Sequence, residues 1–190
     1  MQKITLILVL TLALLAGLHG GEMVVLPTIS RVPSATRKVT AEFDRQIRES
    51  AARSKMQLVS VEETGKALER FCISAEMPVY NAKRLQDMAK HLRAKRMYRI
   101  VIQNFSVYSR QLRTAESPNG DTFYFGRLQG TVQRINSSGL VEEARIFTVN
   151  LDTMHTPPPA ESAEWNAELL AMEMIREAVM RKIPVLGDAG

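Results

Sequence analysis

The sequence predicts an α/β (α+β) protein built on a single mixed β-sheet of about five strands, with helices packed on it. Three observations carry this prediction. Strand-type apolar runs alternate with amphipathic helical stretches in the first half, two later strand patterns flank an Asn-Ser-Ser-Gly turn, and the last long pattern has helical spacing. Strand-helix units followed by a β-hairpin and a C-terminal helix favour parallel inner strands.

The N-terminus has the layout of a secretory signal. Lys3 precedes an apolar run at residues 4–18, which is followed by small residues at Gly20 and Gly21. About 15 apolar residues rise only about 22 Å as a helix, which is less than the roughly 30 Å of a hydrocarbon core. We therefore predict cleavage between residues 16 and 21 and export to the periplasm; an uncleaved inner-membrane anchor is the alternative.

The remaining chain has the size and composition of one folded unit. The full sequence has 190 residues, of which 45% are hydrophobic, and it contains no repeat. We divide it into a signal peptide at residues 1–21, a single α/β domain at residues 22–186 and a flexible tail at residues 187–190.

The domain opens with a predicted strand and a long helix. Residues 23–27 form a short apolar run that ends at a proline, and a loop through Ser34 follows. Across residues 38–54, apolar side chains recur every four positions, at Phe43, Ile47 and Ala51. This spacing predicts an amphipathic helix that covers one face of the sheet.

A second strand and two further helices are expected next. Residues 56–61 alternate as a strand does, and Glu62 and Glu63 then open a short helix that reaches Arg70. Asn81 is suited to cap a third helix, whose apolar stripe consists of Leu85, Met88, Ala89 and Leu92.

The second half predicts an inner strand, a hairpin and a closing helix. Residues 97–108 have two apolar faces, with Tyr98, Ile100 and Ile102 on one and Val101, Phe105 and Val107 on the other. Residues 121–135 and 140–151 read as hairpin strands, in which Gly126 and Gly130 indicate a bulge or close packing. Prolines 157–159 form a stiff spacer before a helix at residues 163–183, whose predicted stripe is Trp165, Leu169, Met172, Ile175, Val179 and Ile183.

No motif for catalysis, nucleotide binding or metal binding stands in the sequence. The only histidines after the leader are His91 and His155, and Cys72 is the only cysteine, so a zinc site lacks its ligands and no internal disulfide can form. We expect Cys72 to be a buried apolar thiol. The prediction is therefore a protein with no catalytic residues, no cofactor and no metal.

The candidates for catalytic side chains are two acidic pairs, Glu62-Glu63 and Glu142-Glu143, and the pair of Asp152 and His155. Adjacent carboxylates, such as Glu142 and Glu143, point in divergent directions and are interpreted as a solvated edge. The alternative function is a small exported hydrolase or transferase whose residues converge only in the fold, such as Asp152, His155 and Glu143.

One charged cluster is a candidate binding site. Loss of the leader leaves 24 basic and 20 acidic side chains, a net charge of +4, which outside the cytoplasm suits anionic envelope surfaces better than nucleic acid. A possible anion or partner patch surrounds the end of the third helix, at Lys90, Arg93, Lys95, Arg96 and Arg99. The competing interpretation is that these cations offset the helix dipole.

The order of elements resembles a family of bacterial envelope domains that includes CsgG, LpoB and the amino-terminal domain of TolB. The resemblance is carried by V-V-L-P at residues 24–27, the helix E-F-D-R-Q-I-R-E-S-A, the unit M-Q-L-V-S-V-E-E-T-G-K-A-L-E-R, the helix and strand A-K-R-L-Q-D-M-A-K-H-L-R-A-K-R-M-Y-R-I-V-I, and the hairpin R-I-N-S-S-G-L-V-E-E-A. It covers about residues 23–183. No lipidation cysteine follows Leu14-Leu15-Ala16-Gly17, unlike in CsgG and LpoB.

The resemblance implies a non-catalytic adaptor that contacts envelope partners or assembles with them. The leading function is a periplasmic protein-binding or assembly module, docked through an unpaired sheet edge or through the basic helix end. The partner is expected to be another envelope protein or an anionic envelope surface, not nucleic acid. The oligomeric state stays open.

Overall fold

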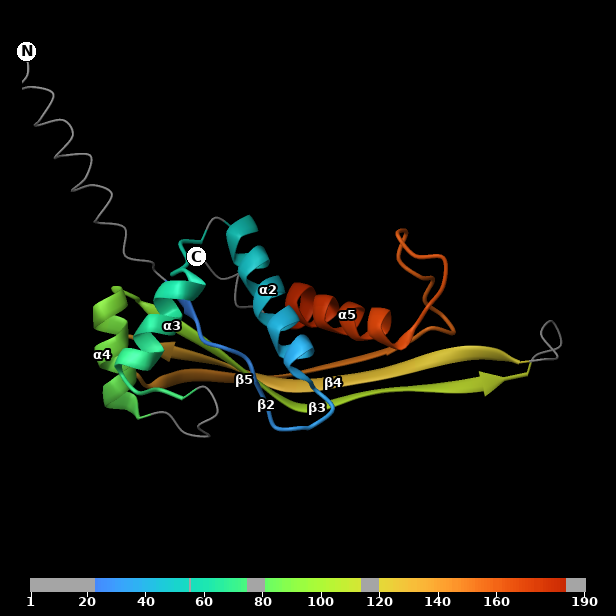
Figure 1. Ribbon diagram of the computed structural model, residues 1–190, viewed down its shortest axis with the longest axis horizontal. Coiled ribbons are helices and arrows are strands. Elements are labelled where there is room, and N and C mark those ends of the chain that lie inside the picture. Colours follow the sequence, from blue (N-terminus) through green and yellow to red (C-terminus); the bar gives the residue numbers. More distant parts are fainter. Residues whose placement is uncertain (1–22, 55, 75–80, 114–119, 184–190) are drawn as a thin grey trace, which may run out of the picture.

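A single mixed five-stranded sheet forms the centre of the protein, as predicted. The computed structural model describes residues 23–54, 56–74, 81–113 and 120–183 (Figure 1). The strand order is β1-β3-β4-β5, and β2 also pairs with β3. The two short strands run parallel to β3, whereas β3, β4 and β5 are antiparallel to one another. The prediction of parallel inner strands is therefore wrong, because the inner strands β3 and β4 form an antiparallel hairpin. The strands are β1 (Met23–Val25), β2 (Ile29–Ser30), β3 (Arg96–Leu112), β4 (Asp121–Asn136) and β5 (Val141–Asp152).

The helices cover the sheet unevenly. α2 and α5 lie together over one face, whereas α3 and α4 lie at the end where β1 begins (Figure 1). Among the described residues, no helix lies against the opposite face along the part of β3 and β4 that is farthest from α3 and α4 (Figure 1). The elements are α2 (Arg37–Arg53), α3 (Val61–Arg70), α4 (Ala82–Leu92), α5 (Ala167–Glu177) and the π-helical turn η1 (Ala178–Lys182).

Two apolar cores follow from this arrangement. The larger one joins α2, α5 and one sheet face, with Phe43 and Met174 fully buried. The smaller core joins α3 and α4 to the start of β3, and it contains the buried side chains of Leu85, Met88 and Met97. The predicted stripes of α2 and α4 are confirmed, apart from Leu92, which is only partly buried.

The face assignment in the inner strand is wrong beyond Ile102. A β-bulge shifts the register between Ile102 and Asn104, so that Phe105 and Val107 turn towards the same core as Ile100. Gly130 lies opposite the bulge, and a Cβ atom there would lie 2.7 Å from the carbonyl oxygen of Val101. The prediction of close packing at Gly130 is confirmed, and it also holds at Gly126, where a Cβ would lie 2.5 Å from the sulfur of Met174.

Several predicted boundaries are corrected. Residues 56–61 form no strand, because Leu58 makes only an isolated bridge to Met23 and the capping box of Ser60 and Glu63 starts α3 at Val61. A two-residue strand, β2, lies within the predicted loop. The last helix begins at Ala167 and not at residue 163, because the Asn166 side chain accepts a hydrogen bond from the Leu169 amide, 2.8 Å away.

The predicted apolar stripe of this last helix is confirmed at its end, where Ile175, Val179 and Ile183 are buried, and is wrong at its start. Its buried positions in α5 are Leu170, Ala171, Met174 and Ile175, whereas Leu169 and Met172 are only partly buried. Trp165 precedes the helix and takes no part in the stripe. The signal peptide, Pro78 and the tail lie outside the described residues.

The expectation of a buried Cys72 is wrong. Cys72 is exposed and has a left-handed backbone, with φ at 50°. It lies directly after α3, where its amide donates to the carbonyl of Glu69 and the amide of Ile73 donates to the carbonyl of Leu68. The chain reversal puts Ile73 in the core and turns Cys72 outward.

A half-buried carboxylate ties the loop after β1 to α2. Asp44 accepts hydrogen bonds from the amide and the hydroxyl of Thr28, at 2.9 and 2.6 Å. One turn later, the guanidinium of Arg48 donates to the carbonyls of Val25 and Val59, each at 3.0 Å. Burial raises the pKa of Asp44 above its ordinary value of 3.8, although both Thr28 hydrogen bonds and Arg48 oppose this shift.

The raised pKa gives a pH dependence of known sign. The folded state binds the Asp44 proton more tightly than the unfolded state does, so this contribution to stability is fully present below pH 3.8 and is lost as the pH rises through the raised pKa. Asp44→Asn removes this contribution. Urea unfolding at a series of acidic pH values is therefore expected to show the wild type losing stability relative to the variant as the pH rises. A difference that grows in the opposite direction would contradict the assignment.

Candidate functional site

The far part of the β3-β4 hairpin presents an aromatic cluster on a face that no described helix covers. We call residues 104–112 and 121–129 the distal hairpin. The rings of Tyr108 and Phe125 stack with centroids 5.4 Å apart and planes inclined by 16°. The guanidinium of Arg110 lies 5.5 Å from the Tyr108 ring and 5.9 Å from the Phe125 ring. Tyr108 is nevertheless 50% exposed, so the cluster is available to a ligand.

The outer edge of β5 is open within the described chain. β5 pairs with β4 through eleven aligned residue pairs, and no other described strand pairs with it. Its first half carries charges, because Arg134 of β4 forms ion pairs with Glu142 and Glu143 at 3.4 Å and Arg145 pairs with Glu143. The prediction that Glu142 and Glu143 lie at a solvated edge is confirmed, but the prediction that their carboxylates diverge is wrong. Both meet Arg134, at the place where a register shift between Arg134 and Ile135 interrupts the regular alternation.

The second half of the same edge is unprotected. Residues 146–151 contain no charged residue and no proline, which are the features that usually prevent an edge strand from pairing with another chain. Phe147 and Val149 point into the larger core, whereas Ile146 is 70% exposed on the other face. A short strand edge with free pairing capacity therefore adjoins an exposed aliphatic side chain.

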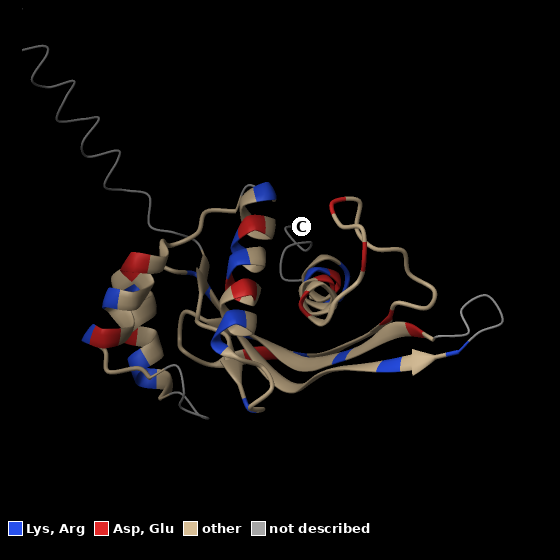
Figure 2. Cartoon of the chain, turned by 45° about the vertical axis from the view of Figure 1, so that its right-hand side comes forward, with Lys and Arg blue, Asp and Glu red and all other residues tan. Residues whose placement is uncertain are grey.

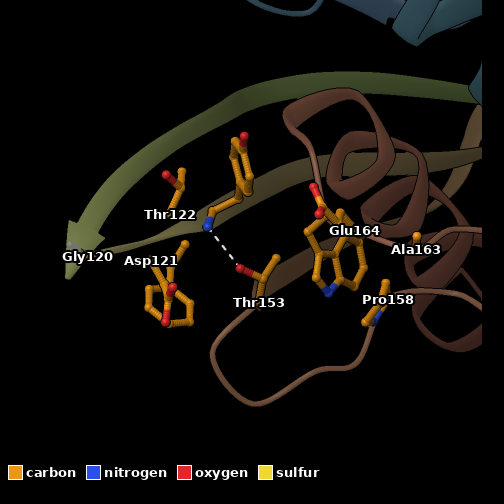
Figure 3. Close-up of a pocket in the computed structure, with 10 residues that line it drawn as sticks. Gly120, Asp121, Thr122, Thr153, Pro158, Ala163 and Glu164 are labelled. Atoms are coloured by element: carbon orange, nitrogen blue, oxygen red, sulfur yellow. Dashed lines mark hydrogen bonds between the residues drawn. The ribbon is translucent and has the colours of Figure 1, made fainter. Parts of the chain in front are cut away.

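A hollow of about 540 Å³ lies where β5 ends. Figure 3 shows Asp121 and Thr122 of β4 on one side, Pro158, Ala163 and Glu164 of the following loop on the other, and Thr153 between them. Phe123, Tyr124 and Trp165 supply aromatic rings to the lining. None of these residues was predicted to belong to a binding site. Trp165 in particular was assigned to the apolar stripe of the last helix. The proline run followed by the single tryptophan was the available signal.

Hydrogen bonds hold the loop against the strand at this hollow. The Tyr124 amide donates to the Thr153 hydroxyl at 2.9 Å, and the Thr153 amide donates to the Tyr124 carbonyl at 3.0 Å (Figure 3). The indole Nε1 of Trp165 donates to the carbonyl of Thr156 at 2.8 Å. The walls are therefore fixed by backbone contacts, which favours a preformed binding site.

The predicted basic patch is divided by the strand. Lys90, Arg93, Lys95 and Arg96 are exposed around the end of α4, but Arg99 is only 5% exposed. Arg99 alternates with Tyr98 and Ile100 and so faces the side of the sheet opposite the larger core. The surface cluster therefore has four members. Its role as an anion or partner site stays a prediction.

Two of these basic residues, Lys90 and Arg93, also have a structural role at the C-terminus of α4. Arg93 is the left-handed C-cap, with φ at 51°, and its amide donates to the carbonyl of Lys90 at 3.3 Å. Lys90 and His91 lie in the last turn, where positive charge is favourable next to unpaired carbonyl groups.

The three residues of the alternative enzyme site, Asp152, His155 and Glu143, do not all converge. Asp152 and His155 do meet, with Oδ1 and Nδ1 3.1 Å apart. Burial raises the pKa of Asp152, but hydrogen bonds from His155 and Met154 outweigh it, so that the pKa lies below 3.8. Glu143 stands nine residues earlier on the extended β5, about 30 Å away at about 3.3 Å per residue. These side chains cannot act on one substrate atom.

The described residues contain neither a cluster of metal ligands nor a helix suited to cross a membrane. No group of three His, Cys, Asp or Glu side chains in them is placed to hold a metal ion. Among the same residues, no helix combines the length and the apolar character needed to cross a membrane.

Comparison with known proteins gives likeness in structure only. No family model matches the chain, and no curated protein matches it. The fold is similar to lipoprotein GNA1162 from Neisseria meningitidis, with 10% identity, 86% of this chain and 97% of that chain covered, and a TM-score of 0.54. This likeness shows a shared fold.

Two other solved structures are similar at lower scores. The LpoB C-terminal domain from Salmonella enterica has 14% identity, with 68% of this chain and 82% of that chain covered, and a TM-score of 0.47. The hypothetical protein CT253 from Chlamydia trachomatis has 15% identity, with coverage of 85% and 94%, and a TM-score of 0.49. The specific likeness to CsgG and TolB stays a prediction.

Proposed function

We propose that the chain is an exported, non-catalytic protein-binding module of the bacterial cell envelope, which docks an extended segment of another envelope protein onto β5. The observation that carries the proposal is the open edge at residues 146–151, which has neither charge nor proline and lies beside exposed Ile146. Such an edge offers unpaired main-chain donors and acceptors to an incoming strand.

The geometry of β5 supports strand addition. The strand is 12 residues long and is held in register by β4 along most of its length, so an added strand meets a preformed template. Main-chain hydrogen bonds supply affinity without a special motif, which agrees with a sequence in which no motif stands out. Ile146 supplies the apolar contact that makes pairing selective.

Export is supported by two separate observations. Lys3 and the apolar run at residues 4–18 have the layout of a secretory signal. The shared fold is that of a protein named as a lipoprotein, GNA1162. The residue that directly follows Gly17 in this chain is Leu18, whereas a cysteine stands there in a bacterial lipoprotein.

Fractionation of a bacterium that expresses the full chain tests export. We expect a mature protein that has lost about 16–21 residues, found in the periplasmic fraction. A full-length mass in the inner membrane would favour the anchored alternative. A full-length mass in the cytosol would overturn the proposal.

We expect the four exposed basic residues around the end of α4, Lys90, Arg93, Lys95 and Arg96, to contribute little to docking on β5. Charge reversal at Lys95 and Arg96 to glutamate leaves the β5 edge intact, so partner recovery from the envelope should stay within about twofold of wild type, since rim charges contribute little affinity. Cross-linked complexes are quantified from equal amounts of folded protein. Loss of recovery would move the docking surface to the end of α4.

A further inference from the structure

The hollow beside Thr153 combines aromatic walls with negative charge. Phe123, Tyr124 and Trp165 line it, together with the carboxylates of Asp121 and Glu164. No lysine or arginine is among its lining residues. Aromatic faces carry partial negative charge, so rings and carboxylates in one hollow favour an organic cation.

The loop that forms one wall has the same charge bias. Residues 153–166 contain Glu161 and Glu164 but no lysine or arginine, and Figure 2 shows red without blue along this loop. The Glu164 side chain is exposed and has no ion-pair partner among the described residues. A cation in the hollow would therefore meet a carboxylate that is not already neutralised.

The position of the hollow relates it to the proposed docking edge. Thr153 directly follows Asp152, the last residue of β5, so the hollow opens at the end of the edge strand. Ile146 and Thr153 are seven residues apart, about 23 Å along an extended chain. Consider a partner segment that pairs along this edge and has one residue beside Ile146. The residue about seven positions further along that segment would lie at the hollow.

We propose that this hollow binds the cationic side chain, lysine or arginine, of the segment that docks on β5. The cation would lie against the aromatic rings with its charge directed to Glu164. The source of the cation rests on the proposed function, whereas the preference of the hollow for a cation does not.

Trp165 makes the binding directly measurable, because it is the only tryptophan of the chain. The probe is acetyl-Gly-Gly-Lys-Gly-Gly-amide, with arginine and norleucine versions, titrated into the full mature protein. We expect a saturable change in tryptophan emission with the lysine and arginine peptides, at least about tenfold tighter than with norleucine. Equal binding of the norleucine peptide would overturn the assignment of a cation site.

Matched variants locate the effect. Glu164→Gln should weaken lysine-peptide binding about tenfold, whereas Glu161→Gln, on the same loop but outside the lining, should not. Trp165→Phe, followed by calorimetry, should keep most of the affinity and Trp165→Leu should lose it. Equal loss in both glutamine variants would reduce the effect to general charge and contradict the site.

A further titration separates the sources of the cation. Ethanolamine, the amine of a lipid headgroup, is expected to bind more weakly than the lysine peptide; tighter binding would overturn the assignment to a protein partner. If Glu164→Gln alters peptide binding but β5 variants do not alter partner recovery, the proposed function fails and the cation site stands. The opposite pattern rejects the cation site alone.

Discussion

Ile146→Lys is expected to reduce the affinity for the envelope partner at least about 30-fold while leaving the fold intact. Ile146 is 70% exposed, so its replacement removes no core contact. A lysine on an edge strand is a feature by which natural sheets prevent strand addition. Loss of a central apolar contact in an interface typically costs about 2 kcal/mol or more, which corresponds to about 30-fold in the dissociation constant.

Val61→Lys is the matched control for this variant. Val61 is similarly exposed, at 66%, but it begins α3 at the other end of the molecule from the distal hairpin. Both variants are compared by quantitative recovery of the cross-linked partner, with circular dichroism and thermal unfolding to verify the fold. Equal recovery with both lysine variants would show that the β5 edge is not the docking site.

Gly139→Ala is expected to destabilise the protein by about 3 kcal/mol. Gly139 has φ at +78° in the turn between β4 and β5, a region that costs other residues about 1–2 kcal/mol. A Cβ atom there would also lie 2.1 Å from the carbonyl oxygen of Ala82, so that the turn and α4 would have to separate. Backbone strain and overpacking add here because the clashing atom belongs to the main chain.

Gly65→Ala tests whether the effect is specific to this turn. Gly65 lies inside α3, and nothing stands within 4 Å of a Cβ at that position. Alanine in a helix interior should therefore increase stability by up to about 1 kcal/mol. Chemical unfolding of the two variants and the wild type measures both changes. A loss below about 1 kcal/mol for Gly139→Ala would contradict the described packing of the hairpin turn on α4.

The sequence predicted the fold well where local pattern and tertiary contact agree. The four-residue spacing of Phe43, Ile47 and Ala51 identified the buried face of α2, and Asn81 was correctly assigned as a cap. The Asn-Ser-Ser-Gly turn was also recognised. The side chain of Asn136 accepts hydrogen bonds from the amides of Ser138 and Leu140, which closes it.

The wrong predictions arise from contacts between elements far apart in the sequence, which the spacing of apolar residues does not reveal. The bulge after Ile102 lies opposite Gly130 of β4, where a Cβ atom would lie 2.7 Å from the carbonyl oxygen of Val101, and it reverses the alternation that assigned Phe105 to the wrong face. β2 is too short for a periodic signal and exists through pairing with Val101 and Ile102. Arg99 was assigned to a surface patch because its charge suggested exposure, although its position in the inner strand buries it.

For the proposed docking edge, the sequence predicted an unpaired sheet edge but not the strand that forms it. An unpaired edge is a consequence of strand order, and the sequence placed β5 in a hairpin without showing that it would be the last strand of the sheet. The aromatic hollow was missed altogether. It requires the loop after Thr153 to fold back on Tyr124, a contact between residues 29 positions apart.

Site-specific photo-crosslinking in living cells tests the central claim most directly. A photoreactive amino acid is placed at position 146 in one strain and at position 61 in another, and the adducts are identified by mass spectrometry. The account predicts that position 146 of the processed protein gives one dominant adduct with an envelope protein and that position 61 does not. The absence of an adduct at position 146, or the same set of adducts at both positions, would contradict it.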